Sequence, residues 1–225
     1  MIFKQFFETE SCTYTYLLAC EETRQAVLID PVASETAKYI KALQGLKLVY
    51  TLDTHVHADH ITAASILREQ YGSTSVIHRN SNVRCGDILV THGCVLRVGH
   101  FDIEVIHTPG HTQACTSYKV NNMVFTGDAL LIDGCGRTDF QHGSAETLYD
   151  SIHQHLFTLA DDTIVYPGHD YKGRTSSTIF QEKNHNSRLT RSKSEFIDLM
   201  NNLNLPYPAK IDIALPANQT CGEDK

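Results

Sequence analysis

The segment THVHADH at residues 54–60 constrains this chain more than any other part of its sequence. It places three histidines and an aspartate close together, namely His55, His57, Asp59 and His60. Four ligand-type side chains at this spacing predict a metal site. The first two imidazoles can face one ion, while the aspartate and the third histidine can face a second ion or brace the first pair. The spacing alone leaves both possibilities open.

Short apolar segments separated by polar breaks predict a strand-rich chain. The expected strands cover residues 13–19, 25–30, 47–53, 74–78, 94–98, 102–107, 116–120, 122–127 and 163–166. Helices are expected within residues 34–46, 60–72, 144–159 and 192–203. Ser34 is expected to cap the first helix and Gly72 to close the second. Because no linker, low-complexity segment or repeat divides the chain, we expect one α/β domain at residues 1–225.

Three further ligand-type residues follow expected strands. His111 lies in TPGHT, Asp128 in TGDAL and His169 in YPGHD, each beside a glycine. Taken singly, each of them could cap a turn or bond a backbone carbonyl. Strand ends that meet at one rim are where α/β folds place binding groups. We therefore expect these residues to join the first cluster in an open His and Asp site, unlike a closed cysteine cage.

Composition excludes several classes of function. The formal net charge of -7 comes without a basic run, so we expect a small-molecule substrate and no nucleic acid partner. No apolar stretch has the length of a membrane span, and the start carries no signal or transit pattern, so a cytoplasmic protein without a membrane partner is expected. The seven cysteines are odd in number and form no CxxC pair. This predicts neither a disulfide framework nor a zinc ribbon, and it favours a reducing compartment.

The HxHxDH motif at 55–60, taken with His111, Asp128 and His169, resembles the metallo-β-lactamase superfamily. All seven ligand positions usual in that superfamily are occupied. The resemblance implies an αβ/βα sandwich of two mixed sheets covered by helices. On this pattern alone it also implies a two-metal hydrolase in which a bridging hydroxide attacks a carbonyl.

Other segments narrow the resemblance to the persulfide dioxygenases. AVLIDPV, GCGRTDF, YPGHDYKGRT and NLNLPYPAKIDIALPAN are similar to that family, and the similarity extends over residues 10–222. It implies one Fe(II) per chain, held by His55, His111 and Asp128 as a facial triad of two histidines and one carboxylate. The remaining four ligand-type residues, His57, Asp59, His60 and His169, would then brace the triad through hydrogen bonds.

The same resemblance implies a substrate and a reaction. Glutathione persulfide would be oxidised at its sulfane sulfur by O2 and water to sulfite and glutathione. Arg137, Tyr171 and Arg188 match glutathione-binding positions of the family, and Arg offers a bidentate grip on a carboxylate that Lys cannot copy. A separate rhodanese is a conceivable partner, and a homodimer is expected. Cys135 and Cys221 are interpreted as structural rather than catalytic, since no adjacent motif marks an activated thiolate.

Two alternatives remain open from sequence. A glyoxalase II-type thioesterase would use two metals at the same seven positions and would hydrolyse a glutathione thioester. A metal-bound sulfur carrier or sensor would bind a persulfide without turnover. O2 uptake on a persulfide distinguishes both alternatives from the dioxygenase.

Overall fold

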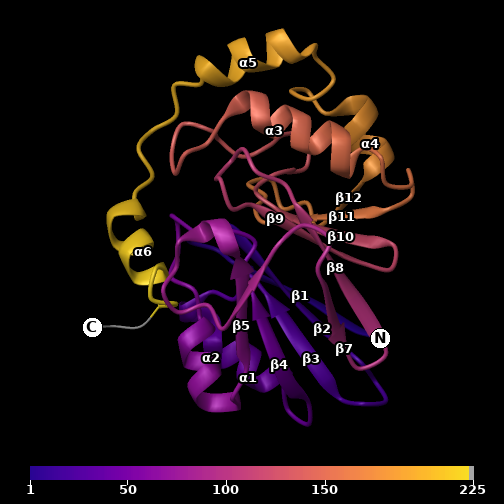
Figure 1. The fold of residues 1–225 in the computed structure, drawn as a ribbon, viewed down its shortest axis with the longest axis vertical. Coiled ribbons are helices and arrows are strands. Elements are labelled where there is room, and N and C mark those ends of the chain that lie inside the picture. The colour runs from indigo at the N-terminus through magenta and orange to yellow at the C-terminus, as the bar shows by residue number, and fades with distance from the viewer. Residues whose placement is uncertain (223–225) are drawn as a thin grey trace.

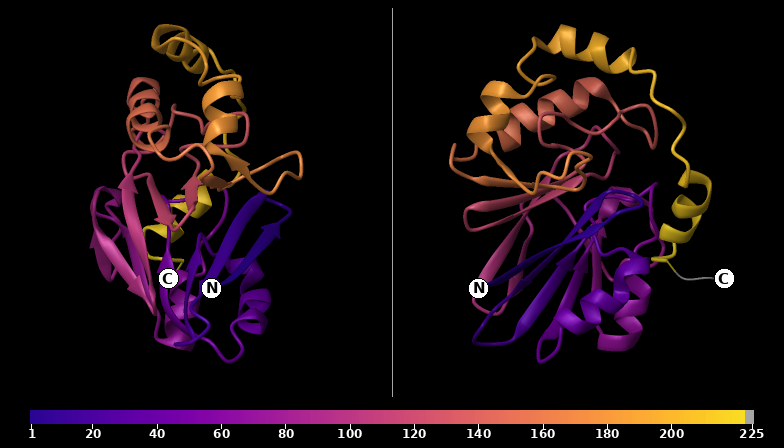
Figure 2. Two further views of the ribbon diagram at one scale, coloured as in Figure 1. Left: turned by 90° about the vertical axis from the view of Figure 1, so that its right-hand side faces the viewer. Right: turned by 180° about the vertical axis from the view of Figure 1, so that it is seen from behind.

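Two six-stranded mixed sheets pack face to face in the computed structural model, which describes residues 1–222, and helices cover their outer faces (Figures 1 and 2). This arrangement confirms the expected αβ/βα sandwich. Residues 223–225 of the expected domain lie outside the described residues.

The first sheet is built from the N-terminal part of the chain and has the order β1-β2-β3-β4-β5-β6. Its strands are β1 (Ile2–Glu8), β2 (Thr13–Ala19), β3 (Gln25–Ile29), β4 (Lys47–Leu52), β5 (Thr74–His78) and β6 (Ile88–Val90). The strands from β1 to β3 pair antiparallel, whereas those from β3 to β6 pair parallel. Parallel pairing requires crossovers: α1 (Thr36–Ala42) joins β3 to β4 and α2 (Ala64–Tyr71) joins β4 to β5 on the outer face, whereas a segment with a 3-10 turn at Arg79–Ser81 joins β5 to β6.

The second sheet has the order β12-β11-β10-β9-β8-β7. Its strands are β7 (Val95–Val98), β8 (Phe101–His107), β9 (Thr116–Val120), β10 (Met123–Gly127), β11 (Ile164–Pro167) and β12 (Ser177–Thr178). Its outer face is covered by α3 (Ala145–Ser151), α4 (Ile179–His185) and α5 (Lys193–Asn201), which lie at the top of Figure 1. Only β10 and β11 pair parallel in this sheet, and the chain between them contains α3.

The core lies between the sheets and draws on both of them. Tyr16 from the first sheet packs against Phe125 from the second, with ring centroids 4.9 Å apart. Two buried tyrosine hydroxyls also join the sheets. Tyr16 donates to the carbonyl of Pro167 at 2.6 Å, and Tyr118 donates to the carbonyl of Asp53 at 3.0 Å. The inter-sheet core therefore fixes strand ends as well as burying apolar area.

Most expected elements are present with small shifts at their ends. The start of α1 and the end of α3 differ from the expected ones for identifiable reasons. Ser34 does not cap α1, because a 3-10 turn at Ala33–Glu35 precedes that helix and the backbone of Ala33 is tied to the carbonyl of Ile61. Ser144 does cap α3, but the helix changes to a π-helical turn at Ile152–Leu156. Gly72 closes α2 in the left-handed conformation, as predicted.

Five elements were not expected from sequence: β1, β6, β12, α4 and α6 (Ile211–Asn218). The β6 and β12 strands have three and two residues, too few for a periodicity to register. Helix α6 contains Pro216, which argues against a helix from local rules. It lies apart from α5, at the end of an extended segment that passes down one side of the molecule to α2 (Figures 1 and 2).

The cysteine prediction was wrong in one respect, because Cys85 and Cys221 form a disulfide. The two residues are 136 positions apart, and only the return of the chain past α2 brings them together. An odd count with no CxxC pair carries no information about such a pairing. The ground for expecting a reducing compartment therefore disappears.

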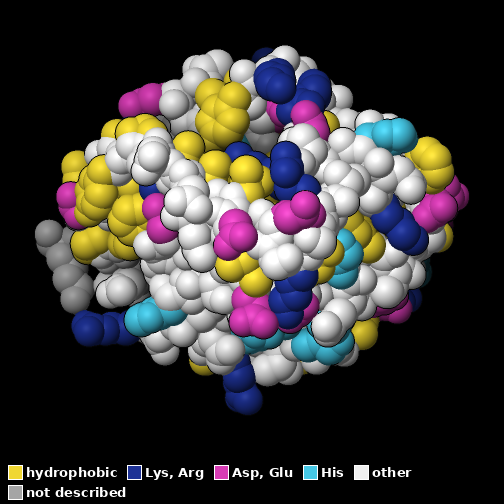
Figure 3. Space-filling view, turned by 90° about the horizontal axis from the view of Figure 1, so that it is seen from above, with side chains coloured by type: hydrophobic (Ala, Val, Ile, Leu, Met, Phe, Trp, Pro, Cys, Tyr) yellow, Lys and Arg dark blue, Asp and Glu magenta, His cyan; other side chains and the backbone are white. Residues whose placement is uncertain are grey.

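The outer surface mixes both signs of charge. In Figure 3, basic and acidic side chains alternate over the face that carries α3, α4 and α5, and hydrophobic side chains gather toward the side of α6. Exposed apolar residues on and before α6 are Leu205, Tyr207 and Ile213. Within residues 1–222, every helix is too short or too polar to cross a membrane.

Candidate metal centre

All seven predicted ligand-type residues meet where strands of both sheets end. The THVHADH segment follows β4, His111 follows β8, Asp128 follows β10 and His169 follows β11. One ligand atom from each of His55, His111 and Asp128 lies within 4.8 Å of the others. The structure thus brings the predicted triad together from three elements.

Hydrogen bonds fix which nitrogen of each histidine in the triad faces the centre. His111 donates from Nδ1 to the carbonyl of Arg137 at 2.6 Å, so its Nε2 keeps a lone pair. Thr54 gives its hydroxyl proton to Asp30 and lies 3.0 Å from Nδ1 of His55, so that Nδ1 donates to Thr54. Both rings therefore present the Nε2 atom, as a metal ligand requires.

Asp128 supplies the negative charge of the triad. Its Oδ1 accepts a hydrogen bond from Nδ1 of His169 at 2.6 Å, and its Oδ2 lies 3.7 Å from Nε2 of His111. Burial would raise the pKa of Asp128, but the neighbouring His169 and His111 hold it well below its usual range. Burial and the nearby His57 and His111 lower the pKa of His55. The triad therefore holds one ionised carboxylate and a neutral His55.

Among the other four residues, the carboxylate of Asp59 is the centre of a hydrogen-bond network that includes His60 and His169. The Oδ2 atom of Asp59 accepts from Nδ1 of His60 at 2.8 Å, from Nε2 of His169 at 3.0 Å and from the hydroxyl of Thr13 at 3.0 Å. Burial would lower the pKa of His169, but Asp128 and Asp59 raise it well above its usual range. His169 thus bridges the two carboxylates as a cation.

His57 is held by a second buried carboxylate. Its Nε2 lies 3.1 Å from Oδ1 of Asp30, which also accepts from the backbone of Thr54 at 2.7 Å. Among the described residues, two buried nitrogens of this cluster lack a hydrogen-bond partner: Nδ1 of His57 and Nε2 of His60. Ligand atoms of His57, Asp59 and His60 also lie within 4.8 Å of one another. These three side chains could therefore hold a second ion.

Two glycines allow the triad to pack closely. A Cβ at Gly136 would lie 2.4 Å from the carbonyl of Asp128 and 2.9 Å from Cγ of His111. A Cβ at Gly168 would lie 2.6 Å from Oδ1 of Asp128. Two imidazole nitrogens and one carboxylate oxygen in such a cradle fit an Fe(II) facial triad. The side chains of His111 and Asp128 remain 12% and 14% exposed, so the centre opens to solvent on their side.

Two of the three predicted substrate residues, Arg137 and Arg188, lie at the segment that follows Asp128, and both already have hydrogen-bond partners. Arg137 makes two 2.7 Å bonds to Asp139 and one of 2.8 Å to the carbonyl of Pro206. Arg188 donates to the carbonyl of Cys135 at 3.0 Å. Tyr171 is 74% exposed, and its ring lies parallel to that of His169 at 6.1 Å. To bind a ligand carboxylate, Arg137 must exchange Asp139 for it.

Neither cysteine singled out from sequence is an exposed, activated thiol. Burial raises the pKa of Cys135 to about 11, although Arg188 opposes the shift. Cys221 is the disulfide partner of Cys85. Their interpretation as structural agrees with these surroundings.

Sequence patterns missed four residues that orient the cluster: Thr13, Asp30, Thr54 and Asn218. Asp30 directly follows β3 and has a positive φ of 51°, which is uncommon for a residue other than glycine and often marks a functional turn. Thr13 and Thr54 carry no such signal, because a hydroxyl's partner depends on the fold. Asn218 lies in the PAN segment, which by itself predicts no contact.

Comparison with known proteins identifies the family to which the chain is similar. The family model described as Metallo-beta-lactamase superfamily matches residues 12–169. The chain is 52% identical to the mitochondrial persulfide dioxygenase ETHE1 of Mus musculus and 51% identical to that of Homo sapiens, over 99% of this chain and 89% of each relative. The crystal structure of ETHE1 from Myxococcus xanthus is 53% identical with a TM-score of 0.97, and the match covers 99% of this chain and 100% of that chain.

A hydrolase is also similar, at lower identity. The probable hydroxyacylglutathione hydrolase glo2 of Schizosaccharomyces pombe is 34% identical over 74% of this chain and 68% of that protein.

Proposed function

This chain belongs to the metallo-β-lactamase superfamily and, within it, to the persulfide dioxygenases, and we propose that it works with a single Fe(II) held by His55, His111 and Asp128. The observation that carries the proposal is the convergence of these three ligand atoms, with each histidine oriented to present Nε2. The activity of the chain is the oxidation of a persulfide's outer sulfur by O2.

The reaction balances with water as a third reactant. A persulfide RSSH, O2 and H2O give RSH, sulfite and two protons, so the outer sulfur loses four electrons to O2. Fe(II) in a triad of two histidines and one carboxylate supplies redox chemistry toward O2 that d10 Zn²⁺ cannot. The protein's own part is to orient the ligands: Arg137 holds His111 through its carbonyl, Thr54 holds His55, and His169 holds Asp128.

We further propose glutathione persulfide as the substrate. Glutathione carries two carboxylates, and Arg137 and Arg188 offer cationic groups beside the segment that leads away from Asp128. Binding would transfer the bidentate contact of Arg137 from Asp139 to a substrate carboxylate. Tyr171, exposed beside His169, would contact the peptide part of the substrate.

An anaerobic metal count followed by oxygen-electrode assays tests the proposal. Protein loaded with Fe(II) is expected to hold one iron per chain and to consume one O2 per glutathione persulfide, with sulfite as product. Matched zinc-loaded protein is expected to consume none. Binding of persulfide without O2 uptake would instead favour a sulfur carrier or sensor.

A second candidate function has one specific observation in its favour. The unpartnered nitrogens of His57 and His60 could hold a second ion, as a glyoxalase II-type hydrolase of glutathione thioesters would require. Two metals per chain with thioester hydrolysis and no O2 uptake would support that function. Against it stands the higher identity to the persulfide dioxygenases, 52% compared with 34% for the hydrolase.

Three further predictions accompany the function. A separate rhodanese would supply or accept sulfane sulfur, the chain would form a homodimer, and it would act in the cytoplasm, although the mammalian relatives are named as mitochondrial. Copurification, light scattering and fractionation of the producing cell would test these three predictions in turn.

A further inference from the structure

The C-terminal helix α6 reaches the segment that carries four of the seven ligand-type residues. The buried side chain of Asn218, the last residue of α6, donates from Nδ2 to the carbonyls of His57 and His60, both at 2.8 Å. Its Oδ1 accepts from the backbone of Thr62 at 2.9 Å. One side-chain amide therefore bonds three backbone groups of residues 54–62, which we call the metal-binding segment. An apolar residue at 218 would leave those buried groups without these bonds.

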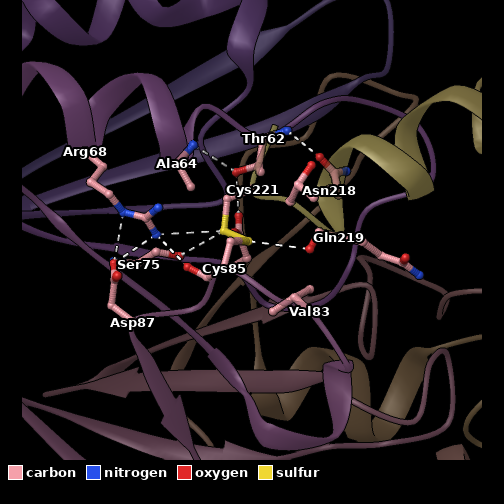
Figure 4. The surroundings of a disulfide bond; sticks show 12 residues. Thr62, Ala64, Arg68, Ser75, Val83, Cys85, Asp87, Asn218, Gln219 and Cys221 are labelled. Atoms are coloured by element: carbon pink, nitrogen blue, oxygen red, sulfur yellow. Dashed lines mark hydrogen bonds and ion pairs between the residues drawn. A yellow bond between two sulfur atoms is a disulfide. The ribbon is translucent and has the colours of Figure 1, made fainter. Parts of the chain in front are cut away.

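A disulfide fastens this end of α6 to the first sheet. Cys221 follows Asn218 by three residues and is bonded to Cys85, in the loop before β6 (Figure 4). Backbone bonds add to the attachment: the carbonyl of Cys221 accepts from Ser65 and that of Gln219 from Arg84, both at 3.0 Å. Since α6 is reached by an extended segment, these links determine where Asn218 lies (Figure 2).

The two sulfurs of the disulfide have different surroundings. Sγ of Cys221 is buried, 3.9 Å from a guanidinium nitrogen of Arg68 and 3.7 Å from the hydroxyl of Ser75 (Figure 4). Cys85 is partly exposed, and its sulfur lies 3.7 Å from the carbonyl of Gln219 at the surface. Thiol exchange is fastest when the attacked sulfur is accessible and the leaving sulfur is stabilised as a thiolate. A thiolate would therefore attack Cys85, and Cys221 would leave between a cation and a hydroxyl donor.

We propose that Asn218 is a positioning residue for the metal centre and that the Cys85–Cys221 disulfide, opened by small thiols, decides whether it holds the metal-binding segment. The proposal rests on the proposed function only in taking that segment to bind the metal. Thiols are the product class of the reaction, since a persulfide that loses its outer sulfur becomes one.

The exchange balances in two steps. A thiolate bonds to Sγ of Cys85 and breaks the disulfide, which gives a mixed disulfide and the Cys221 thiolate. A second thiolate attacks the small-molecule sulfur of the mixed disulfide and releases a small disulfide and the Cys85 thiolate. Two thiols thus supply two electrons, and their two protons end on the cysteines.

Hydrogen exchange of the peptide covering residues 54–62, measured by mass spectrometry on the metal-loaded chain, tests the positioning role. Asn218→Asp keeps an acceptor for Thr62 but loses both donated bonds, and we expect exchange about tenfold faster than in the wild type. Cys85→Ser and thiol-reduced wild type should show the same increase. Asn202→Asp, at an exposed helix end, is the matched control and should leave the rate unchanged.

Metal release and the site of thiol attack complete the test. Loss of iron to a chelator should be about tenfold faster in Cys85→Ser and Asn218→Asp than in the wild type. Under limiting glutathione, the mixed disulfide should form at Cys85. Unchanged exchange and metal release in both variants, or attack at Cys221, would overturn the proposal. None of these measurements uses O2 or persulfide, so a failure of the proposed function would be seen separately in the oxygen-electrode assay.

Discussion

The side chains of His55, His111 and Asp128 are each oriented by a hydrogen bond made on the atom that faces away from their common centre. The partners are the Thr54 hydroxyl, the Arg137 carbonyl and the His169 ring. Partners of this kind fix ring tautomers and tune ligand basicity, and their loss commonly weakens metal binding. At the scale of single residues, the proposed metal centre therefore depends on the residues that orient the three predicted ligands as well as on those ligands.

The proposed division between ligands and bracing residues can be tested by metal content. Asp128→Ala removes the only carboxylate of the triad and is expected to abolish iron binding. His57→Ala is expected to retain much of the iron, because Asp30 and not the centre engages its Nε2. Metal analysis of both variants under anaerobic loading checks this. Equal losses in the two variants would favour two ions.

The cation at His169 gives a second prediction at this scale. His169→Gln would remove one charge that holds Asp128 ionised. Iron affinity is expected to fall by about 10- to 100-fold. Competition with a chelator measures the change, and His185→Gln, at an exposed position, serves as control. Unchanged affinity would show that the bond to Asp128 does not support the ligand.

At the scale of strands and loops, the loops that follow β10 and β11 determine how closely the backbone approaches His111 and Asp128. Gly136 and Gly168 let the backbone approach His111 and Asp128 more closely than any side chain would permit. Asp170 then anchors the loop after β11, because its carboxylate accepts from the backbones of Lys172 and Arg174 and from the Arg174 guanidinium. The GCGRTDF and YPGHD motifs thus combine a close-packing glycine, Gly136 or Gly168, with a residue that orients a predicted ligand, Arg137 or His169.

The loop after β10 offers a matched pair of glycines. Gly136→Ala would push a methyl group against His111 and the carbonyl of Asp128, whereas a Cβ at Gly134 meets nothing within 4 Å. We expect Gly136→Ala to lower metal affinity by at least about tenfold and Gly134→Ala to leave it within about twofold. Calorimetric titration with Fe(II) distinguishes them. Similar values for both variants would mean that the close approach is dispensable.

The anchor at Asp170 predicts a pH dependence of stability. Burial would raise the pKa of Asp170, but hydrogen bonds from Arg174 and Lys172 lower it. A carboxyl whose pKa is lower in the folded state stabilises the fold above its unfolded pKa of about 3.9, and this stabilisation is lost as pH falls toward the folded pKa. Asp170→Asn should therefore lose about 1–3 kcal/mol of unfolding free energy at pH 7. Urea unfolding at neutral and acid pH should show the difference from wild type shrinking below about pH 4.

In the whole molecule, the centre exists because two sheets end at the same rim. Residues from Thr13 to Asn218 contribute to it, so nearly the full described chain is needed to build it. The buried bond from Tyr118, in the second sheet, to the carbonyl of Asp53, which precedes the metal-binding segment, connects the sheets beside the centre.

This connection can be tested by removing one oxygen atom. Tyr118→Phe leaves the ring in place but removes the hydroxyl that donates a hydrogen bond to the Asp53 carbonyl. We expect the free energy of unfolding to fall by about 1–3 kcal/mol, the cost of a buried polar group that loses its partner. Urea denaturation of the metal-free protein measures it. A loss below about 0.5 kcal/mol would show that another donor replaces the tyrosine.

Much of the molecule is determined by local sequence. Apolar segments with the right lengths predicted nine of the strands, because burial between two layers leaves a direct pattern in hydrophobicity. The ligand-type residues could be found too, since His and Asp beside glycine at strand ends have few structural uses. Short edge strands such as β12 and the proline-containing α6 could not be found, because tertiary contacts rather than propensity hold them.

By itself, the sequence determined the fold class and the family, and it singled out the seven residues that are proposed to build a metal centre. The resemblance to the persulfide dioxygenases predicted the division into a triad of His55, His111 and Asp128 and four bracing residues. Only the tertiary structure shows which partners, far apart in sequence, orient these side chains through hydrogen bonds. The Cys85–Cys221 disulfide and the hydrogen bonds from Asn218 to the metal-binding segment are likewise visible only in the tertiary structure. Both depend on the packing of α6 against the first sheet. That packing is set by contacts between segments far apart in the sequence, which no local sequence pattern records.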